Sequence, residues 1–173
     1  TMMNKGLEFI EARYLFNATD DDIKVVIHPQ SVIHSMVSFT DGAILAQLGQ
    51  PDMRTPIAVA LGFPQRLTSG VDMLDFEKLS ELTFRSPDFV RYPCLKLAMQ
   101  ASKSGQGATT CLNAANEVAV DAFLHNQIAY LDIAKVVDGV LQKANVGSLS
   151  SIDEVLETDR KAREIAKSIV GAI

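Results

Sequence analysis

The chain begins with a stretch in which three side chains of different chemistry fall within one turn of a predicted helix. Asn4, Lys5 and Glu8 would share a face, because helix residues three and four apart are neighbours. The Lys5 ammonium suits phosphate, and the Asn4 amide can donate two hydrogen bonds beside it. Both residues fall in the first turn, where the helix dipole favours anions. A carboxylate at Glu8 would repel phosphate unless a divalent cation lay between them, so the three types indicate phosphate beside a metal.

The same residues also fit a simpler interpretation. A Lys–Glu pair three apart on a helix is commonly a solvated ion pair, and one carboxylate does not make a metal site. On this alternative the chain is a non-catalytic dimerisation or interaction module whose surface merely carries Asn4, Lys5 and Glu8. Spacing alone leaves both hypotheses open.

Other polar residues have weaker claims to a site. His28 and His34 are six apart with no third ligand at metal spacing, and an isolated strand histidine is more typical of a hydrogen-bonded structural role. Asn113, Asn116 and Glu117 interrupt an apolar helix, which favours a structural network joining the helices to the sheet.

Hydrophobic spacing predicts the elements that would position these residues. The first helix occupies the opening of the chain, and β-branched runs predict strands at 23–28, 32–39 and 43–48. Thr40-Asp41-Gly42 is a hairpin signal between the last two strands. Asp52 is the expected N-cap of a helix at 53–63. Further helices are predicted at 92–104, 107–126, 131–145 and from 152 onward, the last one after a capping box at Ser151.

These elements predict an α+β fold with a mainly antiparallel sheet. We expect residues 1–62 to form part of an α/β catalytic domain, 63–88 to be a linker, and 89–173 to form a small four-helix bundle. The strands at 32–39 and 43–48 are apolar on both sides. We therefore expect helices to cover one face of the sheet and another element, such as a second subunit, to cover the other.

Composition narrows the classes of partner. The 173 residues carry a net charge of −5 and no basic stripe with interleaved aromatics, so nucleic acid is not an expected partner. No apolar run reaches membrane-spanning length. Cys94 and Cys111 lack CxxC spacing, and we expect free thiols in a reducing cytoplasm.

Five segments together resemble one known family. Residues 2–8, 27–36, 47–57, 88–98 and 112–117 are similar, in the family's order, to 1-deoxy-D-xylulose 5-phosphate reductoisomerases. The resemblance implies a cytoplasmic bacterial enzyme of the non-mevalonate isoprenoid pathway, with a phosphorylated sugar as substrate and a homodimer formed through the sheet domain. It also implies NADPH and a divalent metal (Mg, Mn or Co) as cofactors.

The resemblance further assigns roles to individual residues. It implies that Lys5 and Glu8 are catalytic, that Asn4, Lys5, Glu8 and His34 contact substrate, and that Glu8 binds the metal. Met53, in the loop Gln50-Pro51-Asp52-Met53, is implied to approach the nicotinamide. No GxGxxG turn is present in the sequence, so NADPH is expected to bind mainly to an amino-terminal domain outside it. The chain alone is therefore expected to be inactive.

Overall fold

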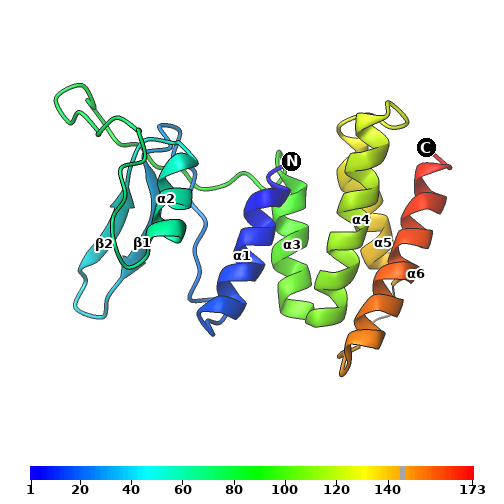
Figure 1. Ribbon diagram of the computed structural model, residues 1–173. Helices are drawn as coiled ribbons and strands as arrows, with labels where there is room; N and C mark the ends of the chain where they lie inside the picture. Colours follow the sequence, from blue (N-terminus) through cyan, green and yellow to red (C-terminus); the bar gives the residue numbers. More distant parts are fainter. Residues whose placement is uncertain (145–146) are drawn as a thin grey trace. The chain divides into compact units, whose positions relative to one another are not determined.

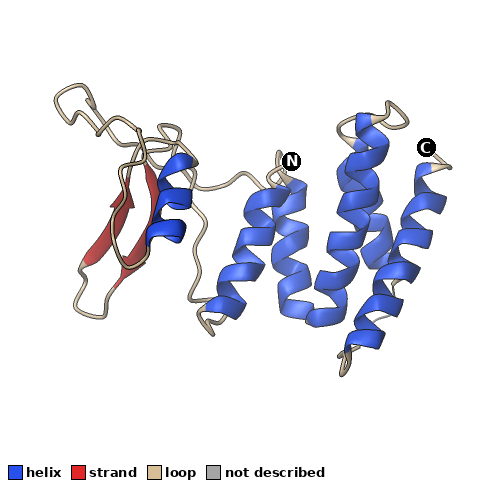
Figure 2. Cartoon of the chain, in the orientation of Figure 1, coloured by secondary structure: helices blue, strands red, loops and turns tan. Residues whose placement is uncertain are grey.

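The computed structural model describes residues 1–144 and 147–173 and contains helices and one small sheet (Figures 1 and 2). Contacts divide the chain into a helical unit, Thr1–Val25 with Pro87–Ile173, and a hairpin unit, Val26–Ser86. In chain order the elements are α1 (Met3–Leu15), β1 (Ile33–Ser38), β2 (Ile44–Leu48), α2 (Arg54–Gly62), α3 (Pro93–Ser104), α4 (Gln106–Leu124), α5 (Asp132–Lys143) and α6 (Ile152–Val170).

The helical unit is built around α4, which packs against α3, α5 and α6. Apart from Leu112, the buried face of α4 consists of small residues, namely Gly107, Ala108, Cys111, Ala114, Ala115, Ala119 and Ala122. Small side chains let neighbouring helices approach closely, and their buried partners Val136, Val137 and Val140 on α5 fill the remaining space. The core of the described residues therefore lies in this unit.

The hairpin unit consists of two antiparallel strands, α2 and a long irregular segment. The pairing runs from Ile33 opposite Leu48 to Ser38 opposite Ile44, with an irregularity between Ile33 and Ser35 that displaces His34. Gly42 takes a φ of +88° in the connecting turn, a value that glycine adopts without steric cost. Val32 is buried, but large apolar side chains remain exposed on the strands and their connection, namely Met36, Val37, Phe39, Ile44 and Leu45.

The structure confirms the α+β class as six helices and a two-stranded antiparallel sheet within the described residues. The predicted helices and the hairpin are found within a few residues of their expected bounds, and Ser151 caps α6 by accepting a hydrogen bond from the Glu154 N–H. The predicted helix end at residue 145 lies outside the described residues.

Two local predictions are corrected. The strand expected at 23–28 is reduced to one bridge between Ile27 and Arg85, because Ile27 alone in this run pairs with a distant main-chain segment before Pro29 ends it. Asp52 does not occupy the N-cap position of α2, which is taken by Met53, although Asp52 Oδ1 does accept a hydrogen bond from the Arg54 N–H at 2.9 Å.

α1 was predicted to belong to a sheet domain of residues 1–62, but its contacts place it in the helical unit. Met3 and Phe9 of α1 are buried, and Gly6 presents no side chain to α3, so α1 packs tightly against that helix. The first helix therefore belongs to the helical unit, which has five helices in its described residues instead of the expected four. The predicted two-sided cover of the sheet is not supplied by the described residues, since the strands are largely exposed.

Candidate functional site

The first turns of α1 bring the three predicted residues into direct contact. Asn4 Nδ2 donates a hydrogen bond to Glu8 Oε1 at 2.7 Å, and Lys5 Nζ forms an ion pair with Glu8 Oε2. Each carboxylate oxygen of Glu8 therefore already has a donor. The side chains of Lys5 and Glu8 remain 48% and 44% exposed, so a ligand can reach the ammonium and the carboxylate from solvent.

Packing on the opposite side of α1 fixes the direction in which this group points. Met3, Gly6 and Phe9 are buried, whereas Asn4 and Lys5 lie on the exposed side of the first turn. Met2, the N-cap residue, gives the helix no side-chain cap. The Met3 N–H donates to the Thr1 hydroxyl at 3.2 Å, but no acidic side chain lies in the first turn, so an anion at the positive end of the helix dipole would be stabilised.

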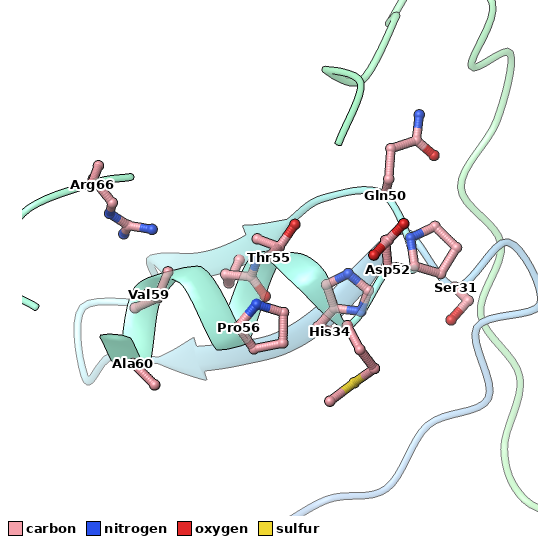
Figure 3. Close-up of a pocket in the computed structure, with 12 residues that line it drawn as sticks. Ser31, His34, Gln50, Asp52, Thr55, Pro56, Val59, Ala60 and Arg66 are labelled. Atoms are coloured by element: carbon pink, nitrogen blue, oxygen red, sulfur yellow. The ribbon is translucent and has the colours of Figure 1, made fainter. Parts of the chain in front are cut away.

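A cavity of about 690 Å³ lies in the hairpin unit and includes the other two predicted residues, His34 and Met53 (Figure 3). The α2 side chains Thr55, Pro56, Val59 and Ala60 form one wall. His34, Ser31 and Asp52 lie at one end of the cavity and Arg66 lies at the other, as Figure 3 shows. The cavity thus combines an apolar wall with a few polar groups, as small-molecule sites commonly do.

The loop that leads into α2 is held by an ion pair. Arg54 Nη2 donates to Asp52 Oδ2 at 2.7 Å, and Arg54 Nη1 donates to the Gly70 carbonyl oxygen at 3.2 Å. Hydrogen bonds from the Arg54 side chain and main chain lower the pKa of Asp52 to about 2. Asp52 is therefore ionised at neutral pH and serves as an anchor for the loop, not as a proton donor.

The predicted residues fall into two groups. Asn4, Lys5 and Glu8 are together on α1 in the helical unit, and His34 and Met53 are together on the cavity of the hairpin unit. The cavity in the hairpin unit includes none of the three α1 residues in its lining. Within residues 1–144 and 147–173 no cluster of three or more His, Cys, Asp or Glu side chains could hold a metal, so Glu8 alone would supply one ligand.

Two lining residues of the cavity were not predicted from the sequence, and the hydrogen-bond network around Glu117 joins different elements from those expected. Ser31 and Arg66 line the cavity without having been singled out; a left-handed φ of +52° at Ser31 has no sequence signal. Glu117 accepts hydrogen bonds from Asn113 at 3.2 Å and from Arg163 on α6 at 2.6 Å. This network therefore joins two helices of the same unit instead of joining the helices to the sheet.

His28 has the hydrogen-bonded structural role expected for an isolated strand histidine. Its Nδ1 lies 2.9 Å from the Thr83 carbonyl oxygen, and its ring stacks on Phe84.

No described helix is long and apolar enough to pass through a bilayer.

The fold and the side chains together define the class of protein. It is an α+β protein whose first helix carries an ammonium and an amide suited to an anion and a carboxylate suited to a cation. Its hairpin unit contains a cavity of the kind that binds small molecules. Residues 48–165 match the family described as the DXP reductoisomerase C-terminal domain. The chain belongs to this family.

Named relatives agree with the match. The chain is 59% identical over its full length to a 1-deoxy-D-xylulose 5-phosphate reductoisomerase of Shewanella sediminis, covering 44% of that protein. It is 56% identical over 98% of its length to the same enzyme of Haemophilus influenzae, covering 43% of it. The chain thus spans less than half the length of these curated relatives.

Solved structures show the same similarity. The reductoisomerase of Zymomonas mobilis in complex with NADPH superposes with a TM-score of 0.91 and 47% identity, over 99% of this chain and 46% of that one. A DOX-P reductoisomerase in complex with NADPH, fosmidomycin and magnesium gives a TM-score of 0.91 and 46% identity, over 98% and 44%.

Proposed function

We propose that this chain is a working part of a bacterial, cytoplasmic 1-deoxy-D-xylulose 5-phosphate reductoisomerase. This enzyme rearranges 1-deoxy-D-xylulose 5-phosphate and reduces the resulting aldehyde with NADPH to 2-C-methyl-D-erythritol 4-phosphate, in non-mevalonate isoprenoid biosynthesis. The observation that carries the proposal is the family match over 48–165, supported by relatives of this name that align along the whole chain. The matched portion alone lacks a dinucleotide-binding turn and would be inactive.

In this proposal Asn4 and Lys5 bind the substrate phosphate. Both residues lie in the first turn of α1, where the ammonium, the amide and the helix dipole all favour an anion. In the absence of substrate, Lys5 neutralises Glu8. Phosphate would compete for the ammonium, which would release Glu8 Oε2 for another cation.

Glu8 has the ligand chemistry of a magnesium site but cannot complete one. Its carboxylate oxygens are hard ligands suited to Mg²⁺ or Mn²⁺, and the remaining ligands must come from outside the described residues. When bound, a divalent cation polarises the carbonyl and hydroxyl oxygens of the substrate. Glu8 itself, as the catalytic carboxylate, would accept a hydrogen bond from a substrate hydroxyl and so orient the substrate for the rearrangement.

His34 and Met53 are assigned to substrate and nicotinamide, respectively. His34 offers ring nitrogens at the polar end of the cavity, where it would orient substrate. Pro51 and Met53, on either side of Asp52, both line the cavity, and these two apolar side chains would keep water from the reacting carbon. NADPH, when bound, supplies the hydride.

The test uses the full-length enzyme that contains this chain. Lys5→Ala and Glu8→Ala should each lower kcat/KM for 1-deoxy-D-xylulose 5-phosphate by about 10²–10³-fold, because each removes a charge that acts on the substrate. Lys161→Ala is the matched control, since Lys161 also pairs with a glutamate on an exposed helix face, and it should leave turnover unchanged. If Lys5→Ala and Glu8→Ala behaved like this control, the non-catalytic alternative would be favoured.

We also propose that the hairpin unit forms a homodimer contact. Val37 and Leu45 lie opposite each other in the sheet register and are 58% and 66% exposed. A two-stranded hairpin with apolar side chains exposed is marginally stable alone, so burial against a second copy would stabilise it. Val37→Glu should convert a dimer to a monomer by light scattering, whereas Val90→Glu, at a 93% exposed position outside this unit, should not. A dimer that persists in Val37→Glu would contradict this contact.

A further inference from the structure

The stretch before β1 is tied by hydrogen bonds to a segment 53 residues later in the hairpin unit. The main-chain N–H of Thr83 donates to Gln30 Oε1 at 3.2 Å. The Thr83 hydroxyl lies 2.9 Å from Nε2 and 3.1 Å from Oε1 of the same amide. One threonine therefore contacts both polar atoms of the glutamine side chain, and we name this contact the Gln30–Thr83 clasp.

Neighbouring contacts reinforce the clasp. His28 Nδ1 donates to the Thr83 carbonyl oxygen at 2.9 Å; because a carbonyl only accepts, this nitrogen carries the proton. The His28 ring stacks on Phe84 with centroids 4.9 Å apart. Ile27 and Arg85 exchange two main-chain hydrogen bonds of 2.8 and 2.9 Å. Residues 27–30 are thus held to residues 83–85 by several contacts.

The clasp lies next to the polar end of the cavity. Gln30 directly precedes Ser31, which lines the cavity together with His34 (Figure 3). Ser31 has a φ of +52°, and its N–H donates to the His28 carbonyl oxygen at 3.0 Å. A left-handed conformation is unfavourable for a serine, so the surrounding contacts must hold it. His28 and Gln30, the first and third residues of this turn, both contact Thr83.

We propose that Thr83 is a positioning residue for the substrate site, acting through Gln30 on Ser31 and His34 although it does not line the cavity itself. This inference depends on the proposed function, because it assigns substrate binding to the polar end of the cavity. Loss of the clasp would let the 28–31 turn relax and would move both side chains away from the substrate, and small misplacements of this kind have large effects on binding and rate.

The experiment compares Thr83→Val with Thr83→Ser in the full-length reductoisomerase. Valine has the shape of threonine without the hydroxyl, whereas serine retains the hydroxyl and is the matched control. Thr83→Val and Gln30→Met should each raise KM for 1-deoxy-D-xylulose 5-phosphate by about tenfold with kcat within about twofold, and Thr83→Ser should stay within about twofold of wild type in KM. Thr83→Val removes the two contacts of the hydroxyl, and Gln30→Met removes these together with the bond from the Thr83 N–H. The double variant should therefore be no worse than Gln30→Met alone.

Several results would overturn the proposal. A KM unchanged in Thr83→Val, or equal losses in Thr83→Ser and Thr83→Val, would show that the hydroxyl does not position the site. A fall in kcat alone that follows the fall in Tm would indicate a purely structural role.

A separate readout distinguishes failure of the clasp from failure of the proposed function. If the wild-type enzyme does not turn over this substrate, the function assignment fails, and hydrogen exchange then tests the clasp. The Ser31 amide should exchange about tenfold faster in Thr83→Val than in Thr83→Ser. Equal exchange in the two variants would overturn the clasp independently of activity.

Discussion

Gly6 on α1 and Ala98 on α3 are so close that a Cβ added to Gly6 would lie under 3.0 Å from the Cβ of Ala98. Real side chains do not approach to this distance, so the two helices could not keep their spacing if residue 6 had a methyl group. Gly6, which lies between Lys5 and Glu8 in the sequence, thus determines how closely α1 packs against α3 and the direction in which Asn4, Lys5 and Glu8 point.

Gly6→Ala should therefore destabilise the protein even though alanine is the better helix former. The propensity gain of about 1 kcal/mol is outweighed by overpacking, which costs about 1–3 kcal/mol and more where backbone must move. Urea unfolding would measure the difference in the free energy of unfolding. Gly139→Ala is the matched control on α5, because there the added Cβ meets only the tip of the Ile169 side chain, which can turn away. Equal effects at both glycines would contradict the close α1–α3 contact.

Acid should remove a contribution that Asp132 makes to stability. Its carboxylate accepts hydrogen bonds from Lys135 Nζ at 2.7 Å and from the Ala129 N–H at 3.0 Å, and these bonds, the lysine first, lower its pKa below 3.8. Because the folded pKa lies below the unfolded one, the ionised carboxylate stabilises the fold above the unfolded pKa, and this is lost as pH falls through the folded value.

Asp132→Asn should accordingly be less stable than wild type at pH 7, and the difference should shrink as the pH is lowered below about 4. Thermal unfolding of both proteins at about five pH values between about 2 and 7 would measure this difference in stability. A difference that is constant over this range would show that the carboxylate charge is not responsible.

Both cysteines should be unreactive in the folded chain. Cys94 and Cys111 are 0% and 1% exposed, and burial raises the pKa of both thiols, so little thiolate forms and reagents have no access. A thiol-specific chromogenic reagent at pH 8 should label neither cysteine in buffer and both in denaturing urea. Rapid labelling of either thiol in the folded chain would contradict the packing of α3 against α4.

Local spacing in the sequence determined the helices, the hairpin and the contact among Asn4, Lys5 and Glu8, but it predicted a strand at 23–28 that is not formed. Residues three and four apart on a helix are neighbours whatever the rest of the fold does, so the sequence was sufficient to predict this group. The hairpin was equally predictable, because Asp41 and Gly42 define its turn by their backbone preferences.

Only the tertiary structure decided the unit to which α1 belongs, the shape of the cavity and the Gln30–Thr83 clasp. α1 packs on α3 because Gly6 has no side chain. The spacing of apolar residues does not show this contact, and it predicted that α1 would pack with the strands that follow it in the sequence. Ser31 and Thr83 lie in irregular segments, where conformation is set by hydrogen bonds to residues far along the chain. Such contacts leave no repeating pattern of polar and apolar residues, and for that reason they are found only in three dimensions.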